Sequence, residues 1–172
     1  MTRSTLADAF EHHAWATLRI LDACSELSPE QLATTVPGTY GSIIDTLRHL
    51  VGADAGYLSL LSGGKVPEIG EEEEPQLDVA QLRDRLAAHG PAWAALMADD
   101  IDPDADVVRH RDDGTDSHAP AGIRLAQALH HGTDHRSQVC TALTTLGIEP
   151  PEIDVWDFGR QGGRVFVTQA GA

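Results

Sequence analysis

The sequence predicts an all-helical protein, in the form of a four-helix bundle with a long crossover connection. Three observations support this class: four segments carry apolar residues at steps of three and four, each segment is bounded by capping or breaking residues, and strand-like character is confined to one short stretch. The 172 residues are expected to form one domain, residues 1–172, because a chain of this length can bury a core of its own.

The first helix is expected over residues 6–27. Its inward positions follow one another by steps of four and three, which places them on one face. They are Leu6, Phe10, His13, Thr17, Ile20, Cys24 and Leu27. The pattern stops at Ser28, a good N-cap, and Pro29 suits the first position of a helix, so a short helical turn is predicted next.

The second long helix is expected from Ser42 to the glycine pair at 63–64, because serine is a good N-cap and glycine commonly ends helices. A polar connection at residues 65–76 follows, and its four consecutive glutamates are expected to face solvent. The third helix is expected from Asp78, a second N-cap residue, to about Asp99.

Residues 103–118 differ from the helical segments. A short β-like piece precedes the turn dipeptide at 113–114, so a small hairpin or an extended crossover is expected before the last helix. The last helix is expected over residues 120–146, where a glycine closes it. The tail beyond it carries Trp156 and Phe158, which are expected to pack back onto the bundle.

Charge and composition narrow the classes of function. The chain has 27 acidic and 12 basic residues, and its net charge of −15 disfavours nucleic acid and anionic membranes as partners. No apolar run approaches the roughly 20 residues needed to span a bilayer, and no secretory signal is evident, so a cytoplasmic protein acting on a small molecule is expected. Cys24 and Cys140 lie in helical patterns and are expected to be buried free thiols.

Nine histidines are present, and their spacing draws attention to the last helix. His131 and His135 lie four residues apart, so their rings share one helix face and can hold one divalent metal ion. Apolar residues continue that face, which therefore points inward, whereas His130 points about a quarter turn away. Burying two imidazoles without partners is costly, and a metal ion would remove that cost.

The third ligand is expected to be His49, in the middle of the second long helix. Small residues on its own face leave space beside the ring for a metal ion and for something bound to it. Asp45, one turn earlier, could accept a hydrogen bond that orients a ring. His13 and His89 also fall on inward stripes, and either could be a ligand or a polar residue of the core.

Other residues near these histidines have structural or open interpretations. Arg136 is expected to be structural and to pair with a carboxylate of the C-terminal tail, because buried arginine is usually paired. Tyr57, two turns beyond His49, could line the mouth of the pocket or simply pack. Trp15 and Trp93 are expected in the core.

These residues resemble the DinB/YfiT-like superfamily of bacterial metal-dependent enzymes over nearly the whole length of the chain. The run LSPEQL is similar to the turn after the family's first helix, and residues 38–64 resemble its second helix, with His49 at the first ligand position. The run HHGTDHRSQV resembles the signature His-x-x-x-His-Arg-Gly-Gln. It places His131 and His135 at the second and third ligand positions, with Ser137 in place of the usual glycine.

The resemblance implies a four-helix bundle, a metal site formed by His49, His131 and His135, zinc or nickel as the metal, and commonly a homodimer. It also implies thiol chemistry, because members of the superfamily use a low-molecular-weight thiol to isomerise or conjugate small electrophiles. Three neutral histidines leave a fourth position on the metal open, where a thiol or a water loses its proton more easily.

A thiol-dependent transferase or isomerase is therefore the leading expectation for function. A metal-dependent hydrolase is the first alternative, because the same ligands serve both reactions and only the pocket differs. A metal-binding stress protein without turnover is the second, and a plain bundle with polar core histidines is the third. No residue is identified from the sequence as a general acid or base.

Overall fold

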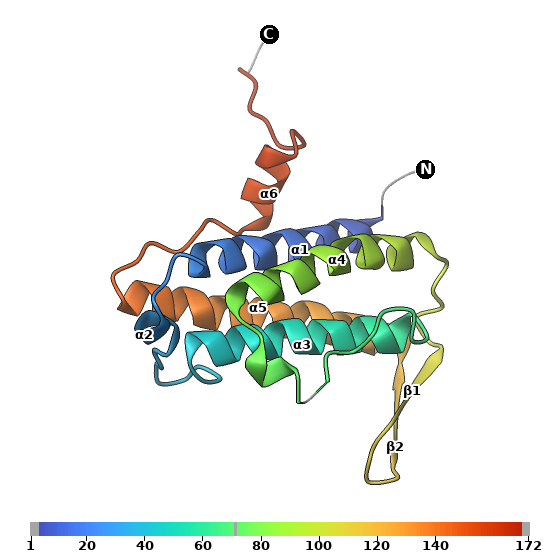
Figure 1. Cartoon of the computed structure of the whole chain (residues 1–172). Coiled ribbons are helices and arrows are strands. Elements are labelled where there is room, and N and C mark those ends of the chain that lie inside the picture. The colour runs from blue at the N-terminus through green and yellow to red at the C-terminus, as the bar shows by residue number, and fades with distance from the viewer. Residues whose placement is uncertain (1–3, 71, 170–172) are drawn as a thin grey trace.

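The structure is a computed structural model that describes residues 4–70 and 72–169. Over these residues the protein is mostly helical, as predicted, and Figure 1 shows four long helices running alongside one another. These are α1 (Thr5–Cys24), α3 (Ile43–Leu61), α4 (Val79–Ala98) and α5 (Ala121–Thr145). Helices α1 and α3 each pack against both α4 and α5, so the four helices enclose a common interior.

The helix starts follow from capping residues that the sequence makes visible. Ser42 precedes α3, and its hydroxyl oxygen accepts a hydrogen bond from the backbone N–H of Asp45. Asp78 and Gln81 form a reciprocal capping box at the start of α4. Ser28 begins the short helix α2 (Pro29–Leu32) in the same way. The predicted starts of these helices are therefore confirmed.

A small hairpin separates α4 from α5, as the turn dipeptide indicated. Strands β1 (Asp106–His110) and β2 (Asp116–Pro120) pair antiparallel, with Val108 opposite His118. The guanidinium of Arg124 on α5 donates hydrogen bonds to the carbonyl oxygens of Val107 and Ser117, which fastens the hairpin to the helix. The polar connection before α4 includes a short 3-10 helix, η1 (Glu74–Gln76).

The buried apolar residues form two clusters, one toward each end of the helices. The larger includes Ile20, Leu47 and Leu143, and the smaller surrounds Phe10 and Trp93. On the first helix, Phe10, Ile20 and Cys24 of the predicted inward stripe are buried in these clusters, whereas Leu6 is 39% exposed. Trp93 is buried, as expected, whereas Trp15 is only half-buried. A layer of polar side chains separates the two clusters. On α1, α4 and α5, the residues of this layer lie in the sequence between residues of the smaller cluster and residues of the larger one.

The C-terminal tail forms a further helix, α6 (Val155–Gln161), which the sequence analysis did not predict. Phe158 packs against His12 and Trp15 of α1, which confirms half of the prediction for the tail. The prediction for Trp156 is wrong, since its side chain is 69% exposed. A short helix that lies on a neighbour by one face cannot bury two residues that point in nearly opposite directions. Figure 1 shows α6 projecting from α1.

The fold bears on two further expectations, one about membrane-spanning helices and one about the two cysteines. Within residues 4–70 and 72–169, no helix is both long and apolar enough to span a bilayer. Cys24 and Cys140 are both free thiols, and Cys24 is buried, as predicted, while Cys140 is half-buried.

Candidate metal centre

The packing of α3 against α5 brings together three histidines that are far apart in the chain. His49 comes from α3, and His131 and His135 come from successive turns of α5. One ring nitrogen from each lies within 4.8 Å of those of the other two. The Nε2 atoms of His49 and His131 are only 3.0 Å apart. His135 is buried, and the other two are half-buried, so the cluster lies at the edge of the helical core.

The chemistry of this donor set fits a divalent metal ion. Burial, together with repulsion from the neighbouring His135 and His49, lowers the pKa of His131 to about 4. Burial, followed by the proximity of His135, also lowers the pKa of His49. Both rings are therefore neutral at physiological pH and offer the lone pairs that a metal ion requires. The Nε2 atoms of these two rings, 3.0 Å apart, converge on one point, as two ligands of one metal ion do.

The remaining coordination positions are not filled by the usual protein ligands. Among the residues that the structure describes, no fourth histidine, cysteine or carboxylate joins the cluster of three. Structural zinc sites are commonly closed by four protein ligands, whereas catalytic sites keep three and leave a position for water or substrate. The donor set is therefore of the open kind.

Gln138, which the sequence analysis did not single out, orients one of the rings. The Nδ1–H of His135 donates to Oε1 of Gln138 at 3.0 Å, which leaves Nε2 of His135 free to face the other rings. The same oxygen accepts a hydrogen bond from the backbone N–H of Tyr40 at 2.9 Å. The sequence did contain a signal for Gln138, because the signature His-x-x-x-His-Arg-Gly-Gln has a glutamine three residues after its second histidine.

Both tyrosines of the chain border the cluster. The ring of Tyr40 stacks on His49 with a centroid separation of 4.1 Å and an interplanar angle of 9°, while remaining 57% exposed. Tyr57 meets His131 edge-on at 6.0 Å, so both interpretations offered for it, pocket lining and packing, agree with its place. The space predicted beside His49 is thus partly occupied by Tyr40. That residue lies in a loop, where no periodicity could have revealed it.

Asp45 does not orient His49, so that expectation is wrong. Its carboxylate accepts a hydrogen bond from the Ser42 hydroxyl at 2.5 Å and lies 3.7 Å from Nη1 of Arg48. Asp45 sits in the first turn of α3, where a carboxylate is favoured by the N-terminal end of the helix. Together with Tyr40 and Glu74 it borders a polar hollow of about 400 Å³.

His13 and His89 do not join the metal cluster, and the alternative of polar core residues is the one observed. Both rings bind the carboxylate of Asp54, which is 3% exposed: Nε2 of His13 lies 2.8 Å from Oδ1, and Nδ1 of His89 lies 2.7 Å from Oδ2. The indole N–H of Trp93 donates a third hydrogen bond to Oδ1 at 3.0 Å. Asp54 was missed because a single acidic residue on a helix gives no sequence signal of burial.

Arg136 is structural, as predicted, but its predicted partner was wrong. Its guanidinium is buried and Nη1 donates to Thr17 Oγ1 at 3.0 Å and to Nδ1 of His13 at 3.2 Å, while Nη2 donates to Thr133. Because arginine can only donate, Nδ1 of His13 must be the acceptor, and the His13 proton lies on Nε2, facing Asp54. The side chain is thus directed inward to α1 and not toward the C-terminal tail.

The network buries two charged side chains, Asp54 and Arg136. Burial alone raises the pKa of Asp54, but hydrogen bonds from His13 and His89 outweigh burial and hold that pKa well below its usual value. Burial lowers the pKa of Arg136 to about 10, so the guanidinium stays protonated at neutral pH. The carboxylate of Asp54 and the guanidinium of Arg136 are therefore buried in one network, joined through the ring of His13.

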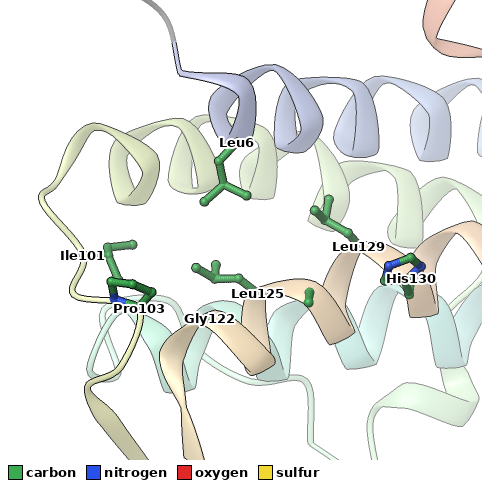
Figure 2. Close-up of a pocket in the computed structure, with 8 residues that line it drawn as sticks. Leu6, Ile101, Pro103, Gly122, Leu125, Leu129 and His130 are labelled. Carbon is green, nitrogen blue, oxygen red and sulfur yellow. The ribbon is translucent and has the colours of Figure 1, made fainter.

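His130 lies apart from the metal cluster, as its position on the helix predicted. It is exposed and borders a cavity of about 450 Å³ between α1 and α5. Figure 2 shows Leu6, Ile101 and Leu125 around this cavity, with His130 at one end. The three histidines of the cluster do not line this cavity, so the cavity and the histidine cluster use different faces of α5.

Fold and site together define a class: a helical protein in which two adjacent helices present three imidazoles suited to a divalent cation. Comparison with family models gives the family of this chain. The model of the DinB family matches residues 1–163, and the chain belongs to that family. Among curated proteins, none matches the chain.

Proposed function

We propose that this protein is a divalent-metal-dependent enzyme that activates a low-molecular-weight thiol for transfer to, or isomerisation of, a small electrophile. His49, His131 and His135 would hold the metal ion, with zinc or nickel as the expected metals. The observation that carries the proposal is the convergence of three imidazoles from two helices, with no fourth histidine, cysteine or carboxylate closing the set within the described residues. An open cation of this kind lowers the pKa of a thiol or water that reaches it.

The protein's own residues account for the rest of the proposed site. Gln138 fixes the ring of His135 through its Nδ1–H, so that Nε2 is directed to the site. Tyr40 covers one face of His49 and has an exposed phenol ring, which would form a wall for the bound electrophile. The half-buried rings of His49 and His131 leave the cluster accessible from solvent on one side.

The cysteines of the chain favour a thiol supplied from outside. Burial raises the pKa of Cys24 to about 12, and burial also raises the pKa of Cys140. Neither sulfur is a ready thiolate at neutral pH, and neither belongs to the histidine cluster. A thiol-dependent reaction at this site therefore requires a thiol cosubstrate.

The proposal extends to architecture and assembly. We take the four long helices as a four-helix bundle of the DinB type, with the long connection between α3 and α4 as its crossover. We also expect a homodimer, which the exposed apolar side chains Ile123 and Trp156 support. Light scattering after gel filtration tests the dimer, and a mass of 18.4 kDa, that of one chain, would contradict it.

The experiment that tests the function begins with metal quantitation of the purified protein. The loaded protein is then assayed with several small thiols, glutathione and cysteine among them, against an activated aryl chloride. We expect bound divalent metal near one per chain and metal-dependent conjugation. His131→Ala should lose both, while His130→Ala, one residue away and outside the cluster, should retain both.

The same assay separates the alternatives. Hydrolysis of an activated ester without any thiol, abolished by His131→Ala, would favour a metal-dependent hydrolase. Tight metal binding without turnover on any probe would favour a non-catalytic metal-binding protein. Absence of bound metal, with no thermal shift on adding zinc or nickel, would leave the three histidines as polar core residues and end the proposal.

A further inference from the structure

The buried polar layer joins all four long helices at one level. His13 and Thr17 come from α1, Asp54 from α3, His89 and Trp93 from α4, and Arg136 from α5. Its members are almost completely enclosed: Asp54 is 3% exposed and Arg136 is also 3% exposed. The larger apolar cluster lies on one side of this layer and the smaller on the other.

The layer touches α5 at the turn that carries the metal-binding histidines. Arg136 directly follows His135, and Gly132 directly follows His131. The ring of His13 lies so close to Gly132 that a Cβ atom there would be 2.3 Å from His13 Cε1. Helix α5 is therefore held by His13 between its two histidines and by the hydrogen bonds of Arg136 just after the second.

The layer also touches α3, the helix that supplies the other histidine. Asp54 lies five residues after His49, about one and a half helical turns further along. Its carboxylate receives the Nε2–H of His13, whose Nδ1 receives the N–H of Arg136. A continuous chain of hydrogen bonds thus runs from α3 through α1 to α5. It ends on α3 at Asp54, five residues after His49, and on α5 at Arg136, the residue after His135.

We propose that the chain Arg136–His13–Asp54 sets the register of α5 against α3, so that these three are positioning residues for the three-histidine site; this inference rests on the proposed metal binding. A buried ion pair is weak evidence for a role in stability, because apolar residues of similar size often serve as well. Hydrogen bonds, by contrast, fix distance and direction. Apolar packing alone would allow small sliding of the helices that the narrow geometry of metal ligation does not tolerate.

The test uses two substitutions of His13 in the full-length protein. His13→Gln retains an amide N–H for Asp54 and a carbonyl oxygen for Arg136, whereas His13→Leu removes both functions at similar size. The control is Leu82→Ala, which destabilises the larger apolar cluster and leaves the polar layer intact. The readouts are the affinity for Zn²⁺ in competition with a chromogenic chelator and the visible absorption spectrum of the Co²⁺-loaded protein.

We expect His13→Leu to weaken Zn²⁺ binding by about tenfold or more, the usual effect of removing a residue that supports metal ligands, and to change the Co²⁺ spectrum. His13→Gln should stay within about threefold of the wild type. Leu82→Ala should be destabilised toward urea but keep the wild-type affinity and spectrum. Equal losses of affinity in His13→Leu and Leu82→Ala would reduce the layer to a stability element and overturn the proposal.

A milder variant covers the case in which His13→Leu does not fold. Thr17→Val keeps the shape of the side chain and removes one acceptor of Arg136, so it should weaken Zn²⁺ binding in the same direction by a smaller factor. A wild-type affinity and spectrum in Thr17→Val would then refute the positioning role. If the wild-type protein itself binds no metal ion, the proposed function fails with it, whereas normal binding in both wild type and His13→Leu contradicts the positioning role alone.

Discussion

Gly132 provides the sharpest test of the packing between α1 and α5. It lies inside α5, a regular helix, so glycine is not required there for backbone conformation. A Cβ atom at this position would lie 2.3 Å from Cε1 and 2.7 Å from Nδ1 of His13, and 2.9 Å from Nη1 of Arg136. Ordinary contacts begin at 3.4 Å, so Gly132→Ala must displace a ring that is hydrogen-bonded at both nitrogens.

The size of the effect follows from three contributions. Replacing glycine by alanine within a helix ordinarily stabilises a protein by about 1 kcal/mol. Overpacking of a buried site costs about 1–3 kcal/mol, and weakening a hydrogen bond to a charged group costs about 1.5–3 kcal/mol. The net expectation for Gly132→Ala is a loss of about 1.5–5 kcal/mol. For a chain of this length that corresponds to a Tm lower by roughly 3–20 °C.

Gly56→Ala is the matched control. Gly56 also lies within a long helix, α3, and a Cβ atom there would have no neighbour within 4 Å. This variant should be stabilised by up to about 1 kcal/mol, so the two glycine-to-alanine changes have opposite signs. Urea denaturation followed by circular dichroism, in the presence of a metal chelator, measures both. If Gly132→Ala proved as stable as Gly56→Ala, the close contact between His13 and α5 would be refuted.

Three further predictions concern the polar layer, the histidine cluster and the tail. Asp54→Asn should lower the free energy of unfolding by about 3 kcal/mol or more, because it leaves Arg136 buried without its counter-charge; urea denaturation with less than about 1 kcal/mol lost would contradict this. The pKa of His131, lowered from 6.5 to about 4, implies stability that is complete above pH 6.5 and is lost as the pH falls toward 4. Because the ring is only half-buried, solvent screening reduces this loss to about 1–2 kcal/mol. This loss of stability should be absent from metal-free His131→Gln. A pH profile identical to that of the metal-free wild-type protein would disprove that His131 causes the loss. Phe158→Ala should release α6 from α1, so trypsin should cleave after Arg160 faster while Zn²⁺ affinity stays unchanged; unaltered cleavage would show that α6 is held by other contacts.

The local structure could be predicted because its causes are local. The caps at Ser42 and Asp78, the apolar stripes, and the turn dipeptide at 113–114 each act over a few residues, and the helices and the hairpin follow from them. The spacing of His131 and His135 likewise fixes their common face, because a helix repeats every 3.6 residues. His49 could be named because it lies on an inward stripe of a second helix and because the resemblance pointed to it.

What remained hidden depends on contacts between segments that are distant in the chain. Tyr40 stacks on His49 because a loop before α3 folds over the cluster, and no periodicity describes a loop. Asp54 and Arg136 were visible only as one acidic and one basic residue on two helices. Their shared partner His13 became evident once α1 was placed between them.

The sequence by itself determined where the four long helices begin, which faces turn inward and which two histidines share one face of α5. Only the tertiary structure decided that Asp54 and Arg136 are buried on opposite sides of one imidazole, that Trp156 points to solvent, and that Gln138 orients His135. The physical reason is that hydrogen bonding and helix capping act between near neighbours in the chain. The burial of a charge depends on everything that surrounds it, and those surroundings exist only after the helices have packed.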